Sequence, residues 1–463
     1  MASGIDPRIA AYVEQHRTAL LEDLKQLVAI PSISTLSEHR ADVRHAAEFL
    51  ATQLREQAGL RHVELIESEH GGHPLVYGEW LEIANKPTVL IYGHYDVQPV
   101  DPLELWRTPP FEATVDGDNL RGRGSVDDKG PTLAAIKALA VLRAVDGCLP
   151  VNVKVLLEGE EENGGESIAA YVKQHADRLR ADAALILDTG MLDVGIPTLT
   201  NGLRGISYFE LQADGARQDL HSGSYGGIAP NPIQALCWVL SELKGRDGHI
   251  HIPGLYELMR PLSEAERRNF EQQSLDEAPR LMQAAGLQEL PGEQGYSVIE
   301  RATARPTLEV HGIRGGFTGE GAKTVIPATA TAKISLRLVA DQQPDTVLEL
   351  VKKRVAELGV PGITLTVRNL HGGDGVSVPQ DSPVLQAAAA ALESEFGREV
   401  AYVRSGGSIP IAALFSAVLK LPLVMMGFGL ADDNVHAPNE KFYLPNYYAA
   451  IRSVATFLQR LSV

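Results

Sequence analysis

The sequence predicts an α/β fold with a mostly parallel sheet and helices on both faces, interrupted by a smaller α+β domain. The first observation is a set of short apolar, β-rich runs that alternate with segments of helical periodicity, at residues 88–92, 151–157, 183–187 and 421–428. Strands that alternate with helices in this way are typical of a parallel sheet covered on both sides. The second observation is that the pattern between the third and fourth runs changes to β-α-β-β-α-β, the order of a split βαβ sandwich.

The elements of the α/β part follow from apolar spacing. Residues 7–28 and 41–59 carry apolar side chains at helical intervals, which predicts two surface helices. Residues 131–145, between the first two strands, predict a helix with proline in its first turn, where its missing N–H costs nothing.

The middle of the chain predicts the second domain. Its expected strands are 206–213, 307–313, 330–339 and 363–368, and its expected helices are 231–243 and 344–358. Residues 246–305 are charged and helical in pattern, so we interpret them as an insertion before the second strand. Because the fourth α/β strand follows this interruption, we assign residues 1–205 and 371–463 to one domain and residues 206–370 to the other.

Composition excludes several classes of protein. Of 463 residues, 44% are hydrophobic and 22% charged, as in globular proteins. The net charge of −17 argues against binding to nucleic acid or anionic membranes, which need clustered positive charge. No uncharged apolar run reaches ~18 residues, and the first residues lack the apolar core of a secretory signal. Two cysteines, Cys148 and Cys237, favour a reducing, cytoplasmic location.

Histidine and carboxylate side chains follow each of the four α/β strands. Ligands bind beyond the carboxyl ends of the strands in open α/β sheets, so we expect these side chains to converge at one edge. They are His94 and Asp96 after the first strand, Asp127 and Asp128 in the glycine-rich loop GRGSVDDKG, Glu158, Glu160, Glu161 and Glu162 in EGEEEN after the second strand, Asp188 after the third, and His436 after the fourth.

A set of two histidines and several carboxylates, without cysteine, suits zinc, with manganese and cobalt as alternatives. Five side chains exceed what one ion needs, and they suit two divalent ions that share a bridging carboxylate and activate a water between them. These five are His94, Asp127, Glu162, Asp188 and His436. Asp96, two residues from His94, is placed to accept the hydrogen bond that fixes the tautomer of that histidine.

Seven motifs occur in the order GHYDVQP, GRGSVDDKGP, EGEEENGGES, QDLHSGSYGG, KTVIPATATAKISLRL, RSGGSIP and NVHAPNEKF, from residue 93 to residue 442. This set resembles the dinuclear zinc metallopeptidases of the carnosinase and cytosolic non-specific dipeptidase type. The resemblance implies that His94 and Asp188 bind one ion, that His436 and Glu162 bind the other, and that Asp127 bridges both. It also implies a cis Asp127–Asp128 bond, and Glu161 as the general base that takes a proton from the attacking water.

The same resemblance implies residues that contact the substrate. His221 would reach the site from the partner subunit of a homodimer and stabilise the oxyanion, while Thr324, Arg337 and Ser408 would line the pocket. Arg337 suits a C-terminal carboxylate because its planar fork binds carboxylates in bidentate fashion. The inserted domain would serve as lid and dimer interface. The implied reaction is hydrolysis of the peptide bond of dipeptides.

Two alternatives stay open from the sequence. One is an N-acyl-amino-acid deacylase of the same fold, which the motifs QDLHSGSYGG and RSGGSIP and the long inserted domain disfavour. The other is a non-catalytic binding protein on this fold, disfavoured because all five ligand positions and Glu161 are filled.

The segment GGFTGEGAKT resembles a phosphate-binding loop, but Ala322 stands where that loop needs glycine, and a strand-like pattern follows Thr324. Asp128 has two readings, a helix cap or a support for the site.

Overall fold

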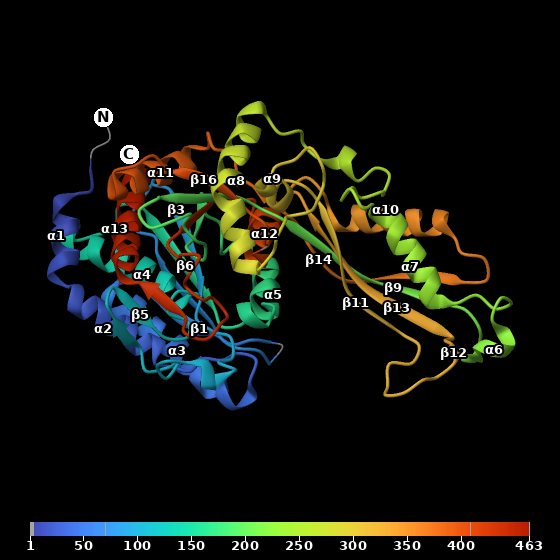
Figure 1. Ribbon diagram of the computed structural model, residues 1–463. Coiled ribbons are helices and arrows are strands. Elements are labelled where there is room, and N and C mark those ends of the chain that lie inside the picture. The colour runs from blue at the N-terminus through green and yellow to red at the C-terminus, as the bar shows by residue number, and fades with distance from the viewer. Residues whose placement is uncertain (1–3, 70, 408, 463) are drawn as a thin grey trace. The chain divides into compact units, whose positions relative to one another are not determined.

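The computed structural model describes residues 4–69, 71–407 and 409–462 (Figure 1). The chain divides into two compact units. The first unit comprises Met1–Asn201, Val378–Val403 and Pro410–Val463, and the second comprises Gly202–Ser377 and Arg404–Ile409. The short segment Arg404–Ile409 therefore groups with the second unit, whereas the sequence interpretation put it in the first.

Three helices form the N-terminal part of the first unit. The periodicity over residues 7–28 is divided between α1 (Pro7–Gln15) and α2 (Arg17–Val28), which are separated by His16 in a non-helical conformation. The expectation of one helix there was wrong, because apolar periodicity continues across a break of one residue. Helix α3 (Arg40–Thr52) continues into a π-helical turn at Gln53–Gln57.

The central sheet of the first unit runs in the order β1-β2-β6-β3-β7-β17-β8, and β16 also pairs with β8. Its four central strands, β6, β3, β7 and β17, are parallel, and the strands on either side are antiparallel. The bounds are β1 (Arg61–Ile66), β2 (Leu75–Trp80), β3 (Thr88–His94), β6 (Asn152–Glu158), β7 (Ala183–Ile186), β8 (Thr198–Leu203), β16 (Ala401–Ser405) and β17 (Leu423–Gly427). All four predicted parallel strands are present.

Helices cover both faces of this sheet. Successive residues of a strand point to opposite faces of the sheet. On one face, Gly93 of β3 lies against Thr132 of α4 (Lys129–Asp146). On the other face, the centroid of the Tyr92 ring lies 5.8 Å from that of Phe415. Phe415 begins a π-helical turn after α12 (Pro410–Leu414). The remaining helices are α5 (Glu166–Gln174), α11 (Pro383–Phe396) and α13 (Leu444–Leu461), and a small sheet joins β4 (Thr114–Asp116), β5 (Asn119–Arg121) and β18 (Lys441–Tyr443).

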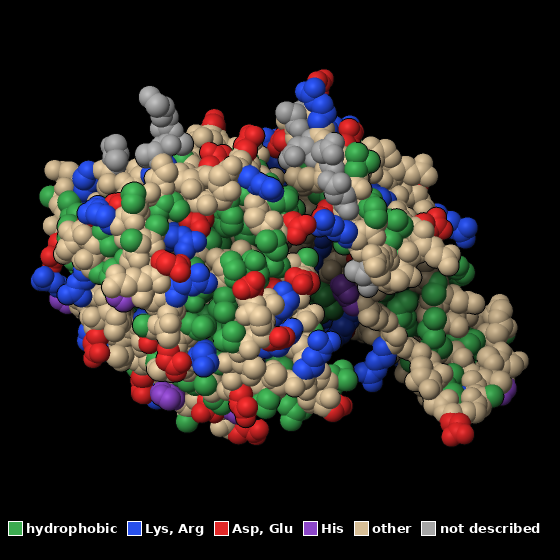
Figure 2. All heavy atoms as spheres, turned by 60° about the vertical axis from the view of Figure 1, so that its left-hand side comes forward, with side chains coloured by type: hydrophobic (Ala, Val, Ile, Leu, Met, Phe, Trp, Pro, Cys, Tyr) green, Lys and Arg blue, Asp and Glu red, His purple; other side chains and the backbone are tan. Residues whose placement is uncertain are grey.

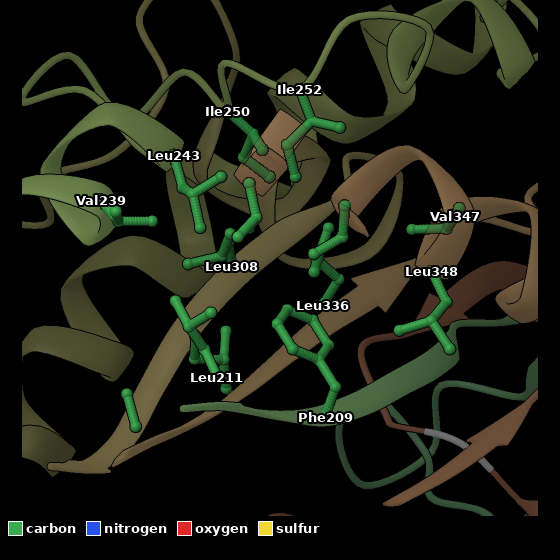
Figure 3. Packing of buried hydrophobic residues seen from close by; sticks show 14 of the residues in the cluster. Phe209, Leu211, Val239, Leu243, Ile250, Ile252, Leu308, Leu336, Val347 and Leu348 are labelled. Atoms are coloured by element: carbon green, nitrogen blue, oxygen red, sulfur yellow. The ribbon is translucent and has the colours of Figure 1, made fainter. Parts of the chain in front are cut away.

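The second unit has the predicted β-α-β-β-α-β order. Its elements are β9 (Gly205–Asp214), α7 (Pro232–Leu243), β11 (Thr307–Gly315), β13 (Thr329–Leu338), α10 (Pro344–Leu358) and β14 (Thr364–Gly373). The strands form an antiparallel sheet in the order β11-β13-β9-β14. Burial alternates strictly along β9, so one face of the sheet packs in the core with α7 and α10 and the other face is partly exposed. Figure 3 shows this core, a single cluster that includes Phe209 and Leu211 of β9, Val239 and Leu243 of α7 and Val347 of α10.

Residues between α7 and β11 form the predicted insertion. It contains α8 (Glu264–Ala285), whose first turn is held by a capping box between Ser263 and Glu266, and α9 (Val298–Thr303). The guanidinium of Arg305 lies over the ring of Tyr296 at 3.9 Å and donates to Glu293 at 2.7 and 2.5 Å. Stacking and a bidentate ion pair thus fasten the end of the insertion.

The surface carries both signs of charge. On the face drawn in Figure 2, Lys and Arg side chains are interspersed with Asp and Glu rather than gathered into one basic patch. Among the described residues, no helix has the length and apolar character needed to span a bilayer.

Candidate metal centre and substrate-contacting residues

The residues expected at one edge of the central sheet do meet there, within the first unit. Strand β3 ends at His94, and β6 is followed by a short 3-10 turn, Glu161–Asn163. Asp188 comes two residues after β7, and His436 lies in the loop after β17. The parallel direction of these strands brings side chains from distant parts of the sequence to the same edge.

Asp127 is the centre of the arrangement. Its Oδ1 lies 3.1 Å from Nε2 of His94, and its Oδ2 lies 2.9 Å from Nε2 of His436. Two triads of side chains, whose ligand atoms lie within 4.8 Å of one another, share this carboxylate. They are His94, Asp127 and Asp188 on one side, and Asp127, Glu162 and His436 on the other. One carboxylate oxygen directed at each triad is the arrangement of a bridging ligand.

The site places two imidazoles among closely spaced carboxylates, and this environment shifts the pKa values of both kinds of group. Hydrogen bonds to Asp127 and Glu162 raise the pKa of His436 to about 10. Burial lowers the pKa of His94, but hydrogen bonds to Asp127 and Asp96 outweigh it and hold that pKa well above its ordinary value. Burial and the neighbouring Asp128 and Asp127 raise the pKa of Asp188. Two imidazoles and three carboxylates, without cysteine, form a donor set that fits a pair of divalent ions.

Asp96 orients both His94 and the turn after β6. Its carboxylate is fully buried and lies 3.4 Å from Nδ1 of His94, whose nearer acceptor is the backbone oxygen of Asp96 at 3.2 Å. The same carboxylate accepts the backbone N–H groups of Glu161 at 3.2 Å and Glu162 at 3.1 Å. Asp96 therefore also fixes the turn that carries Glu161, a role that its spacing from His94 did not predict.

Glu161 combines the properties of a proton acceptor at this site. Burial raises the pKa of its carboxyl, and the negative charges of Glu162, Asp96 and Asp127 raise it further against the opposing effect of His94. A carboxylate with a raised pKa accepts and returns a proton near neutral pH more effectively than an ordinary one.

Asp128 supports the site rather than capping α4. The Asp127–Asp128 bond is cis, as the resemblance implied. The Asp128 side chain makes no capping bond to the helix. Its Oδ2 instead accepts the hydroxyl of Thr132 at 2.8 Å and the backbone N–H of His94 at 3.2 Å. Asp128 thus links the start of α4 to the end of β3.

Glu440 is a site residue that sequence reasoning missed. It is fully buried, and its Oε2 accepts Nη1 of Arg123 at 2.7 Å and the N–H of Gly124 at 2.9 Å. Its Oε1 accepts the N–H groups of Val126 at 3.1 Å and Asp127 at 3.3 Å. Glu440 follows His436 in NVHAPNEKF, but nothing in the sequence connects it with the GRGSVDDKG loop that it holds.

The second unit carries the substrate residues implied by the resemblance. His221, in β10 (Leu220–His221), pairs with Val325 of β12 (Val325–Ile326), and the N–H of Ser222, the first residue of α6 (Ser222–Tyr225), donates to the backbone oxygen of Thr324 at 3.1 Å. His221 and Thr324 therefore adjoin.

Arg337 lies apart from that pair, near the end of β13, opposite Ile206 and Thr307. Ser408 lies outside the described residues. Arg204, which sequence reasoning missed, donates from its Nε to the backbone oxygen of Gly406 at 2.8 Å and from its backbone N–H to that of Gly407 at 3.1 Å. Arg204 thereby holds Gly406 and Gly407 of the RSGGSIP segment.

Comparison with known proteins gives a consistent result. The model of peptidase family M20/M25/M40 matches residues 90–460. The chain is 32% identical to the Cys-Gly metallodipeptidase dug1 of Schizosaccharomyces pombe, with 97% of each chain covered. It is also 32% identical to the Beta-Ala-His dipeptidase of Rattus norvegicus, with 99% of this chain and 96% of the relative covered.

Solved structures agree with these sequence relatives. The M20 family metallo-carboxypeptidase Sso-CP2 from Sulfolobus solfataricus has a TM-score of 0.82 and 34% identity, over 96% of this chain and 99% of that one. The dipeptidase Dug1p from Saccharomyces cerevisiae has a TM-score of 0.78 and 29% identity, over 98% of both chains.

Proposed function

The chain belongs to peptidase family M20/M25/M40, and from that premise we propose that its Asp127-centred site hydrolyses the peptide bond of dipeptides. It is a hydrolase of the metallodipeptidase type. The relatives that align over nearly its whole length are named as a Cys-Gly metallodipeptidase and a Beta-Ala-His dipeptidase, which favours dipeptides over N-acyl amino acids as substrates.

The observation that carries the proposal is the position of Asp127 between two histidines, each with a further carboxylate. His94 and Asp188 would hold one ion, His436 and Glu162 the other, and Asp127 both. We propose zinc as the metal, since histidine and carboxylate without cysteine suit this ion, and manganese or cobalt suit the same set. When bound, two such ions lower the pKa of a water and stabilise negative charge on the scissile carbonyl oxygen.

The chain's own residues then move the protons. Glu161 takes the proton from the attacking water and returns it to the leaving amine. Asp96 supports this step because its carboxylate fixes both the His94 ring and the backbone N–H of Glu161. Glu440 and Asp128 hold the loop on either side of Asp127.

We assign substrate recognition to residues of the second unit. Arg337 would bind the C-terminal carboxylate of the dipeptide, with Thr324 and Ser408 beside the substrate. His221 would donate to the oxyanion from the partner subunit of a homodimer formed through the second unit, which would also serve as a lid. Both cysteines are free thiols, in keeping with a cytoplasmic enzyme.

A substrate comparison tests the proposal. Protein loaded with zinc or with manganese is assayed on unblocked dipeptides and on N-acetyl amino acids of matched side chain. We expect turnover of the dipeptides and loss of that turnover on chelation. Turnover confined to the acylated set would overturn the assignment in favour of the deacylase.

A further inference from the structure

Three aromatic rings stand in a row across the sheet of the second unit. The ring of Tyr208 lies between two imidazoles, with its centroid 5.0 Å from that of His371 and 5.2 Å from that of His311. The planes are nearly parallel, at 9° and 11°. The rings come from β9, β14 and β11, so the row spans the sheet from one edge strand to the other.

The row lies on the face of the sheet opposite the one that packs on α7 and α10. Phe209 and Leu211 of β9 point into the core between the sheet, α7 and α10 (Figure 3). Tyr208, between Ser207 and Phe209, therefore points to the opposite face. His311 and His371 are exposed, and Tyr208 is half-buried between them.

Specific contacts order the row. Strand β13 lies between β11 and β9, and there it carries the small residue Ser335, opposite Tyr208. A bulge in β11 between Val310 and Gly312 directs His311 over this serine, and its Nε2 lies 2.8 Å from Ser335 Oγ. Bulges commonly re-aim a side chain next to a functional site. The small serine leaves the space that lets His311 reach Tyr208.

The row adjoins Arg337 on the same face. Arg337 pairs with Ile206, and Tyr208 is the next residue of β9 on that face, so Tyr208 and Arg337 are diagonal neighbours within reach of long side chains. A second guanidinium is close, because Arg204 Nη1 donates at 3.3 Å to the hydroxyl of Thr307, the residue paired with Arg337. Burial and the charge of Arg337 lower the pKa of Arg204 to about 10.

We infer that the row of Tyr208, His311 and His371 contacts the side chain of the dipeptide's C-terminal residue, and that it favours planar side chains such as phenyl and imidazole. The inference rests on the proposed function, in which Arg337 holds the C-terminal carboxylate. A residue held there places its own side chain beside the neighbouring rings. The imidazoles cover both faces of the Tyr208 ring. Planar groups therefore gain from edge-to-face contact with the row and from stacking on the outer faces of the imidazoles, and polar ring edges offer hydrogen bonds to an imidazole.

Steady-state kinetics on three dipeptides, Ala-Gly, Ala-Phe and Ala-His, test the inference with the Tyr208→Leu variant, which removes the ring and keeps an apolar side chain. We expect kcat/KM to fall about tenfold for Ala-Phe and Ala-His, chiefly through KM. The value for Ala-Gly should stay within about twofold, because glycine has no side chain to contact the row. A matched control is Gln212→Ala, on the same strand and face, whose amide bonds to Asp214 instead of to the rings.

A second variant, His311→Asn, covers the case in which Tyr208→Leu does not fold, since His311 is exposed on an edge strand. His311→Asn should also lower kcat/KM for Ala-Phe and Ala-His but not for Ala-Gly, and the loss should be smaller than in Tyr208→Leu. Equal losses on all three dipeptides, or no loss on any, would overturn the inference. Failure of the proposed function would look different, because the unmodified protein would then hydrolyse none of the three.

Discussion

The Oε1 atom of Glu440 accepts the backbone N–H of Asp127 at 3.3 Å. The same carboxylate takes the N–H groups of Gly124 and Val126 and the guanidinium of Arg123. One buried side chain from the loop of His436 therefore sets the direction of Asp127, and the two loops cannot move independently.

Glu440→Ala should weaken metal binding, because residues that orient metal ligands typically contribute about 10–100-fold to affinity. It should also destabilise the protein by about 3–5 kcal/mol, since Arg123 is left as a buried charge without its partner. Titration of the metal-free protein with zinc measures the first effect, and denaturant unfolding the second. Glu440→Gln keeps the shape of the side chain. Its metal affinity and its free energy of unfolding should therefore lie between those of the unmodified protein and those of Glu440→Ala. Unchanged affinity in the alanine variant would contradict the role.

Glu161→Gln should lower kcat by about 10²–10⁴-fold, the usual contribution of a general base. Metal content should stay unchanged, because Glu161 belongs to neither ligand triad. Kinetics together with elemental analysis of the purified variant separate these outcomes. Glu166→Gln, at an exposed carboxylate in the first turn of α5, is the control and should behave as the unmodified protein does. A glutamine variant with an unchanged rate would remove Glu161 from the mechanism.

His221→Ala should lower kcat without loss of metal, because an oxyanion donor acts on the transition state. If the donor comes from a second subunit, mixing His221→Ala with Glu161→Gln should restore activity in the hybrid dimers that form. Light scattering on the unmodified protein reports the oligomeric state directly. A monomer with full activity would rule out donation from a partner.

Removal of metal should lower the melting temperature. The carboxylates of Asp127, Glu162 and Asp188 meet at one place, and bound cations offset their repulsion. At a free metal concentration 100 times the dissociation constant, binding to the folded state alone contributes about 2.7 kcal/mol. Differential scanning calorimetry with and without a chelator checks this, and zinc added back should restore the transition. Equal melting temperatures would argue against occupied sites.

Metal binding should release protons. In the metal-free chain the pKa of His436 is raised to about 10, so this imidazole is protonated at neutral pH and must lose its proton to become a ligand. Apparent affinity should therefore rise with pH and fall as the solution is acidified. Calorimetric titrations in buffers of different ionisation enthalpy count the protons released. A binding enthalpy that is the same in all buffers would contradict the expectation.

The sequence predicted which side chains meet around Asp127, because these residues lie at local, recognisable places. His94, Asp188 and His436 each follow a short apolar strand, and strand direction alone brings them together. Glu440 and the supporting role of Asp128 escaped because their partners are set by tertiary packing across more than one segment. A buried glutamate has no signature that separates it from a solvated one until the loop folded over it is known.

The fold was predictable where periodicity is long, and less so at edges. The four parallel strands and the β-α-β-β-α-β order were found, while the antiparallel strands β1 and β2 were not. Strand β1 has no buried residue and begins with a register irregularity, and its sequence RHVELI shows no clean alternation of apolar and polar residues. The break at His16 could not be recognised from the sequence, because the helical spacing of apolar residues continues across it.

The position of β17 has a consequence for how the protein is made. Leu423 pairs with Ala184, and Met426 pairs with Leu199 on the other side, so β17 fills a gap between strands synthesised long before it. The entire second unit leaves the ribosome in between. Until residues 423–427 emerge, the growing chain exposes an unpaired parallel edge at β7, and open edges invite wrong partners. His436 emerges later still, so the last of the five side chains proposed as metal ligands joins the site only after β17 has been made.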